Sequence, residues 1–388
     1  MPNKVLNIIA NETNGRCYQS YRYCADDEIK IPTLDYEDKG DSFIIKNSYG
    51  ETDTSLKTTK SLRDFSDKII NIEPLFEFFL DGSRRTYKID DIEINRSVYP
   101  IIAGQIGVAC CQRKSPDKFK CIELENKIVL SLPKAANPNA GDAKLFFNKL
   151  TDKVNQNSII EKRELIFDKI LSYDSRKQDE NTKYENLGIA TIQDEMIETE
   201  KRIVASLYSK RLINANRYLI KDGSLQYKPM KTGDFKELIK IKNHYKSVVG
   251  VSKMFNPELC VDHVGKSNAD KIAELKLYHR TPVYKHSSAV VGDVYFAIWY
   301  VRIREKQYSS SPFSGVLKLE KILITDEEIE NGLDSYEVDL ITANIINERN
   351  PVCYGKDNRW ANHLYPIYLT ETFIKSKYLS DINFLNLF

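Results

Sequence analysis

The hydrophobic positions along the chain form two kinds of pattern, continuous apolar runs and apolar residues at helical spacing. Continuous apolar runs over residues 75–80 (LFEFFL) and 99–111 (YPIIAGQIGVACC) are typical of buried strands. Apolar residues recur at helical spacing over residues 188–210. The same patterns predict further strands over 217–221, 247–251, 293–304 and 314–319, the last two as an antiparallel pair, and helices over 234–245, 326–330, 338–348 and 366–378. Because strands and helices alternate, we expect an α/β fold with one main sheet.

Three regions depart from this pattern. Residues 1–70 are polar and turn-rich, which indicates short strands and loops. Residues 112–185 are charged and rich in breakers, so we expect an inserted helical segment (143–150 and 159–171) there and no core strands. The last eight residues, DINFLNLF, are strongly apolar. We expect this tail and the first 70 residues to be the surfaces that dock a partner.

Composition narrows the class of protein. Of 388 residues, 41% are hydrophobic, which excludes a mainly disordered chain. Lys and Arg number 57 against 55 Asp and Glu, so any nucleic-acid binding needs a locally basic surface. Seven cysteines with no paired CxxC repeat argue against a zinc ribbon and a disulfide scaffold. No secretory signal or membrane-spanning run is evident, so we expect a cytoplasmic protein that does not contact membranes.

The most specific feature is a pair of Asp-Gly-Ser triplets that follow two predicted strands, at Asp81 and at Asp222. Each triplet alone is a common turn sequence. If the two strands are neighbours, however, both carboxylates emerge at the same edge of the sheet. A cluster of oxygen ligands of this kind is what Mg²⁺ or Mn²⁺ requires.

Two further residues are candidates for the same site. Glu200 lies on the apolar stripe of the 188–210 helix, and Glu195 lies at the edge of that stripe. A core-facing carboxylate is costly unless it is paired or binds metal, so the alternative for Glu200 is an ion pair with Lys or Arg. His363 precedes Pro366, which suits the first turn of a helix. A lone His is more often structural than functional.

The order of these motifs resembles the NurA nuclease family over about residues 75–380. The motifs are a strand with DGS, a helix bearing Glu, a second DGSL, a GVSK segment, an HRTP segment and a final HxYP. The resemblance implies an RNase H-like central mixed sheet flanked by helices. It places the nuclease domain at 75–388, with an insertion at about 112–185 and an N-terminal extension over 1–74.

By this resemblance Asp81, Glu200 and Asp222 bind Mn²⁺ or Mg²⁺, and His363 is the fourth active-site residue. Lys253 corresponds to a basic residue that reaches a DNA phosphate. Arg280, in the HRTP segment, and Arg84 and Arg85, after the first triplet, are further candidates for DNA contact. The alternative for Arg84 and Arg85 is a solvated turn.

The implied activity is divalent-metal-dependent hydrolysis of DNA by a homodimer that works with a HerA-like hexameric ATPase. The role would be DNA-end processing or antiviral (anti-phage) defence. The sequence has no GxxxxGK[ST] motif, so ATP use would belong to the partner. Two alternatives stay open at this point. One is a non-catalytic adaptor with a NurA-like fold, and the other is a nuclease acting on RNA or on hybrids.

Overall fold

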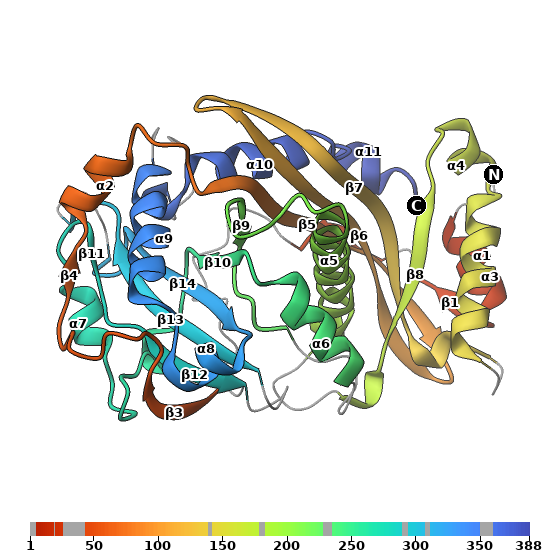
Figure 1. The fold of residues 1–388 in the computed structure, drawn as a ribbon. Helices are drawn as coiled ribbons and strands as arrows, with labels where there is room; N and C mark the ends of the chain where they lie inside the picture. Colours follow the sequence, from red (N-terminus) through yellow and green to blue (C-terminus); the bar gives the residue numbers. More distant parts are fainter. Residues whose placement is uncertain are drawn as a thin grey trace.

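The computed structural model describes residues 5–18, 20–25, 43–138, 142–177, 183–227, 235–288, 294–306, 311–349 and 360–388. A single mixed sheet runs through the molecule in the strand order β3-β12-β13-β14-β10-β9-β5-β6-β7-β8. Helices cover both faces of its central strands (Figure 1). The α/β class with one main sheet and flanking helices is therefore confirmed.

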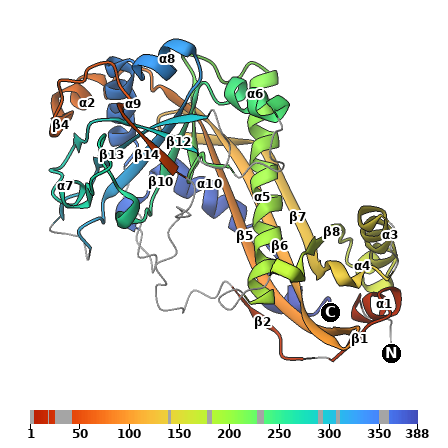
Figure 2. The same cartoon turned by 90° about the horizontal axis from the view of Figure 1, so that it is seen from below.

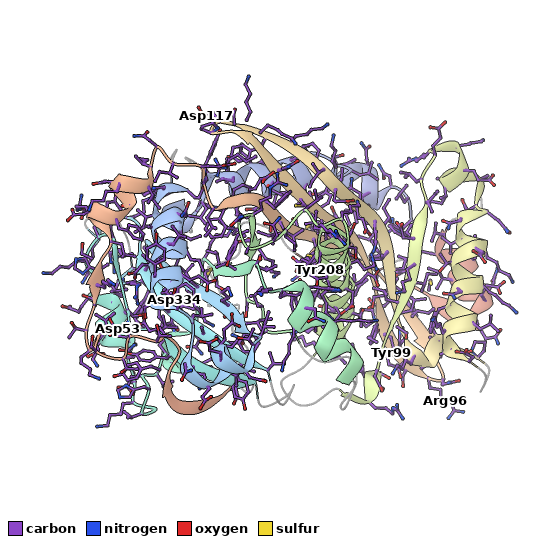
Figure 3. The ribbon with its side chains drawn as sticks, in the orientation of Figure 1. Asp53, Arg96, Tyr99, Asp117, Tyr208 and Asp334 are labelled. Atoms are coloured by element: carbon purple, nitrogen blue, oxygen red, sulfur yellow. The ribbon has the colours of Figure 1, made fainter. Side chains whose placement is uncertain are left out.

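The centre of the sheet is built on three long antiparallel strands. These are β5 (Phe76–Ile94), β6 (Ser97–Ser115) and β7 (Lys118–Pro133). Asp117, at the β6–β7 turn, and Arg96, at the β5–β6 turn, lie at opposite ends of these strands (Figure 3). Beside β5 lie β9 (Tyr218–Asp222) and then β10 (Val248–Ser252), both parallel to it.

The remaining strands extend the sheet in both directions. Beyond β10 lie β14 (Val316–Leu323), β13 (Tyr295–Arg302), β12 (Tyr284–Ser288) and β3 (Phe43–Tyr49), all antiparallel to their neighbours, while β8 (Phe167–Tyr173) runs parallel to β7. The short strands are β1 (Arg16–Cys17) and β2 (Tyr23–Cys24), which pair with β5, and β11 (His279–Arg280), which pairs with β13 and with β4 (Lys60–Ser61).

Two helices pack on opposite faces of the central strands. The long helix α5 (Tyr184–Ser209) contacts β5, β6 and β7 and runs alongside them in Figure 2, whereas α10 (Tyr365–Lys375) contacts β5 and β6. A Cβ added to Gly104 of β6 would collide with Ile192 of α5, and one added to Gly107 would collide with Ile374 of α10. Since Gly104 and Gly107 are an odd number of residues apart, alternation places them on opposite faces.

The other helices cover the two ends of the sheet. At one end α9 (Ser335–Asn347) packs with α2 (Arg63–Ile69), and at the other α1 (Val5–Glu12), α3 (Ala143–Asn155), α4 (Ser158–Lys162) and α11 (Asp381–Leu385) supply side chains to one apolar core (Figures 1 and 2). The remaining helices are α6 (Phe235–His244), α7 (Ala269–Ala273) and α8 (Asp326–Asn331). No helix in the described part of the chain is both long enough and apolar enough to cross a membrane.

Most of the predicted elements are confirmed, but three expectations are wrong. The first strand does not end at Asp81, because residues 81–94 continue to pair with β6 as far as Ile94. The charged 112–185 segment contains the end of β6 and two further strands of the main sheet, β7 and β8. A helix was expected over 159–171. Instead α4 ends at Lys162, and residues 167–173 pair with β7, because tertiary pairing outweighs a weak local helical signal.

The structure also refines the expectations for the two chain ends. In the turn-rich N-terminal region a helix, α1, joins the expected short strands. Of these strands, β1 and β2 pair with the central strand β5, and β3 pairs with β12 at one end of the sheet. In the C-terminal tail, Phe384, Leu387 and Phe388 are buried in the core shared with α1 and α3. These three side chains are therefore not available to a partner, whereas Ile382 of the same tail is exposed. Docking of a partner by the tail stays a prediction.

Candidate functional site

The two Asp-Gly-Ser triplets meet on neighbouring strands. In the parallel β5–β9 pair, Leu80 lies opposite Lys221, so Asp81 and Asp222 are the next residues on adjacent strands. Asp222 is the last residue of β9, whereas Asp81 is inside β5 and only 4% exposed. The structure therefore meets the condition that the sequence analysis left open, that the two strands are neighbours, although only Asp222 ends its strand.

Local backbone geometry fixes the end of β9. Gly223 has a φ of 82°, a left-handed conformation that favours glycine, and its N–H donates to the carbonyl oxygen of Val251. The buried Glu320 of β14 then accepts hydrogen bonds from the Ser224 hydroxyl and the Leu225 N–H, each at 2.8 Å. These hydrogen bonds to Val251 and Glu320 thus hold the DGSL turn in place directly after Asp222.

A lysine and a second helix complete a cluster around these acids. The ammonium group of Lys253 lies 3.0 Å from Oδ2 of Asp222 and 3.6 Å from Oε2 of Glu371 on α10. We call Asp81, Asp222, Lys253 and Glu371 the Asp81 cluster. Asp81 shares its strand face with Phe79, which packs in the same core as Ile367 of α10. The cluster therefore lies on the α10 side of the sheet.

The charges of the Asp81 cluster affect the pKa of Asp81. Burial raises the pKa of Asp81 well above its usual value, and the charges of Asp222 and Glu371 raise it further. Oδ2 of Asp81 is buried and has no hydrogen-bond partner among the described residues. An acceptor of this kind is costly to bury, and its cost is removed when it receives a proton or a cation.

Glu200 occupies the opposite face. Its carboxylate lies 3.2 Å from the ammonium group of Lys221, and both side chains are buried. Burial raises the pKa of Glu200, and the charge of Lys221 opposes that shift. A Cβ on Gly82 would collide with Oε1 of Glu200, so the glycine of the first triplet is what lets this carboxylate reach the strand. We call Glu200 and Lys221 the Glu200 pair.

The sheet thus separates the three acids that the sequence grouped together. Asp81 and Asp222 lie on the face of the sheet that α10 covers, whereas Glu200 of α5 lies on the other face. The charge of Glu200 still raises the pKa of Asp81 slightly. Glu195, the alternative acid of the same helix, binds Lys127 at 3.0 Å and Lys169 at 2.9 Å instead. Of the two, Glu200 is the one within electrostatic reach of the triplets.

Glu371 was missed by sequence analysis. The sequence feature that could have revealed it is its position about one helical turn from Ile367 and Ile374, two buried residues of an amphipathic C-terminal helix. His363 is buried just before that helix, where its ring packs edge-on against Tyr368. The neighbouring Asn362 donates to the backbone carbonyl of Lys253 at 2.7 Å. This hydrogen bond ties the residue next to His363 to the Lys253 segment. The role of His363 as an active-site residue stays a prediction.

The four proposed DNA-contacting cations have different surroundings. Arg280 is 1% exposed and bound by the carboxylates of Glu51 and Asp339, which makes it a structural group and speaks against DNA contact. Lys253 is also buried and is paired with acids, as described above.

Arg84 and Arg85 lie within β5 and not in a turn. Arg84 donates to Gln193 of α5 at 2.6 Å, and Arg85 binds Asp381 of α11 at 2.8 Å. Both guanidinium groups therefore have protein partners, although the Arg85 side chain remains 38% exposed. Contact of these two arginines with DNA stays a prediction.

The chemistry of the Asp81 cluster fits a divalent cation. Its ligand atoms are carboxylate oxygens, which hard cations prefer, and one of them is buried without a hydrogen bond. The described residues include no group of three His, Cys, Asp or Glu side chains already close enough to hold a metal ion. Instead, the ammonium group of Lys253 provides the positive charge between Asp222 and Glu371.

Comparison with known proteins adds no assignment: no protein-family model matches this sequence, and no curated protein matches it either.

Proposed function

We propose that this chain is a divalent-metal-dependent DNA nuclease with an RNase H-like core, related to the NurA nucleases. The topology supports this proposal. Three antiparallel strands, β5 to β7, are followed by the helix α5 and by the strands β9 and β10, which add in parallel on the free side of β5. This is the strand arrangement that we associate with an RNase H-like core, and it places two acids on its central pair of strands.

The observation that carries the proposal is the meeting of Asp81, Asp222 and Glu371 around one buried lysine. We infer that Asp81, Asp222 and Glu371 hold Mn²⁺ or Mg²⁺. Glu200, paired with Lys221 on the opposite face, affects the site only through its charge. When bound, such ions activate water for attack on a phosphodiester and stabilise the leaving oxygen, as in two-metal nucleases.

The chain's own groups prepare the site for this chemistry. Burial excludes water from Asp81, which strengthens every charge interaction around it. Lys253 balances the negative charges of Asp222 and Glu371, so the cluster folds without a metal. Since the same carboxylates would repel DNA, we infer that cation binding precedes DNA binding.

We further propose that the protein acts in the cytoplasm as a homodimer with a HerA-like hexameric ATPase, in DNA-end processing or antiviral defence. This part of the proposal rests on the resemblance of the motifs alone. The N-terminal region remains a candidate for docking the partner.

Cleavage of linear duplex DNA in the presence of Mn²⁺ tests the proposal. Wild type, Asp222→Asn and Asp117→Asn are compared, each alone and with a HerA-like ATPase. Asp117 is an exposed acid at the β6–β7 turn, far along the hairpin, and serves as the matched control (Figure 3). We expect wild type and Asp117→Asn to cleave DNA and Asp222→Asn to lose on the order of 10³-fold in rate.

The alternative is a non-catalytic adaptor that binds DNA or the ATPase. The ion pairs of Lys253 favour this alternative, because they satisfy two of the acids without metal. Wild-type protein that binds DNA but cleaves neither DNA, RNA nor hybrid duplexes in any combination would establish the adaptor. Cleavage of RNA or hybrids alone would shift the substrate and keep the mechanism.

A further inference from the structure

Two cysteines lie directly opposite each other in the sheet, on the two strands that follow β5. Cys111 of β6 pairs with Cys121 of β7 in the antiparallel register, next to an irregularity in the pairing between Cys110 and Cys111. Directly opposite residues in antiparallel strands have Cα atoms about 4.5–5.5 Å apart. Disulfides need roughly 4.4–6.8 Å, so this pair can be bridged without moving the backbone.

Both thiols are reduced in the structure and interact with each other. Cys111 is buried, whereas Cys121 is partly exposed, which gives a small oxidant access to the pair. Side-chain hydrogen bonding with Cys121, together with a smaller contribution from Thr370, lowers the pKa of Cys111 to about 7, against the effect of burial. The thiolate is the nucleophilic form of cysteine, so this shift favours Cys111 as the attacking sulfur.

The neighbouring cysteine provides an internal contrast. Cys110 points to the opposite face of β6, lies across from Glu123 and is fully buried in the core under α5. Burial raises the pKa of Cys110 far above its usual value. Two adjacent cysteines thus differ in partner, in exposure and in the sign of their pKa shift.

We propose that Cys111 and Cys121 form a peroxide-reactive dithiol site that closes reversibly into a cross-strand disulfide. The Cys111 thiolate attacks one oxygen of hydrogen peroxide, the O–O bond breaks, and Cys111 becomes a sulfenic acid as the released hydroxide takes a proton and leaves as water. The Cys121 sulfur then attacks the Cys111 sulfur, the S–O bond breaks and a second water leaves. With hydrogen peroxide, two thiols give up two hydrogens and one peroxide becomes two waters.

This site does not depend on the proposed nuclease function. It lies beside α10, since Thr370 contacts Cys111 and Glu371 is the next residue along that helix. Only the pairing of the two strands and the environment of the two thiols carry the inference.

Mass spectrometry of the folded chain treated with hydrogen peroxide tests the inference. After alkylation and cleavage at Lys and Arg, Cys111 lies in the peptide 97–113 and Cys121 in the peptide 121–127. We expect these two peptides to be linked, with a loss of two hydrogens, and to separate after treatment with dithiothreitol. Cys110→Ser is the matched control and should link as wild type does.

Two variants make the result decisive. Cys111→Ser should show no link, and Cys121→Ser should stop at a sulfenic acid on Cys111 that dimedone captures. Thermal unfolding checks that each variant is folded. The inference fails if both peptides stay unlinked while the protein is folded, or if the link persists in Cys111→Ser or disappears in Cys110→Ser.

Discussion

The Asp81 cluster and the Glu200 pair are both buried combinations of acid and lysine, but they are balanced differently. In the Glu200 pair one carboxylate faces one ammonium, and both are buried. In the Asp81 cluster three carboxylates share the buried Lys253, and the half-exposed Lys375 lies 2.9 Å from Glu371 as a second cation. Asp222 keeps 17% of its side chain exposed. A one-to-one buried pair is a structural device, whereas surplus negative charge with access to solvent is suited to a cation.

The largest expected difference is between Glu371→Gln and Glu200→Gln. Under the proposed function, Glu371→Gln should lower the rate of DNA cleavage at least about 100-fold and weaken Mn²⁺ binding measured by calorimetry. Glu200→Gln should instead lower the free energy of unfolding by about 3–5 kcal/mol, because Lys221 is left buried and without a charged partner.

Urea unfolding of both variants separates the two effects. Equal losses of Mn²⁺ affinity in a stably folded Glu200→Gln and in Glu371→Gln would show that both faces contribute to one metal site. Glu200 would then be a metal-binding residue together with Glu371. The resemblance predicts metal binding by Glu200.

Gly82→Ala tests how the Glu200 pair reaches the strand. The added methyl group would collide with the Glu200 carboxylate, so we expect a loss of about 1–3 kcal/mol in the free energy of unfolding. Combining it with Glu200→Ala, which removes that carboxylate, should recover part of the loss in a double-mutant cycle. Additive losses in the cycle would contradict the close approach.

The smallest expected effect is a gain in stability from Asp81→Asn. The pKa of Asp81 is raised in the folded chain, so the folded state binds this proton more tightly than the unfolded state, whose pKa is about 3.9. The contribution of Asp81 to stability is therefore fully present below pH 4 and is lost as the pH rises toward the folded pKa.

We accordingly expect Asp81→Asn to be more stable than wild type at pH 7 by about 1 kcal/mol and to approach it at low pH. Urea unfolding at several pH values, without added metal, measures the difference. A variant that is less stable at pH 7 than at pH 4, relative to wild type, would show that Asp81 is stabilised as a carboxylate instead.

The sequence by itself determined much of this molecule. Continuous apolar runs identified β6, β9 and β13, because these strands are buried on both faces, and an apolar stripe at period 3.6 identified α5. The repeated Asp-Gly-Ser triplet also singled out Asp81 and Asp222 as candidates for one site, and the pairing of β5 with β9 then made them neighbours.

Only the tertiary structure decided which face each acid occupies. Glu371 joins Asp222 from a helix more than a hundred residues away, and Glu200 is drawn to Lys221 on the far side of the sheet. Likewise, the apolar tail is buried beside α1, and Arg280 is enclosed by Glu51 and Asp339. Such partners are non-local, and local periodicity cannot reveal which charge a folded chain brings opposite another.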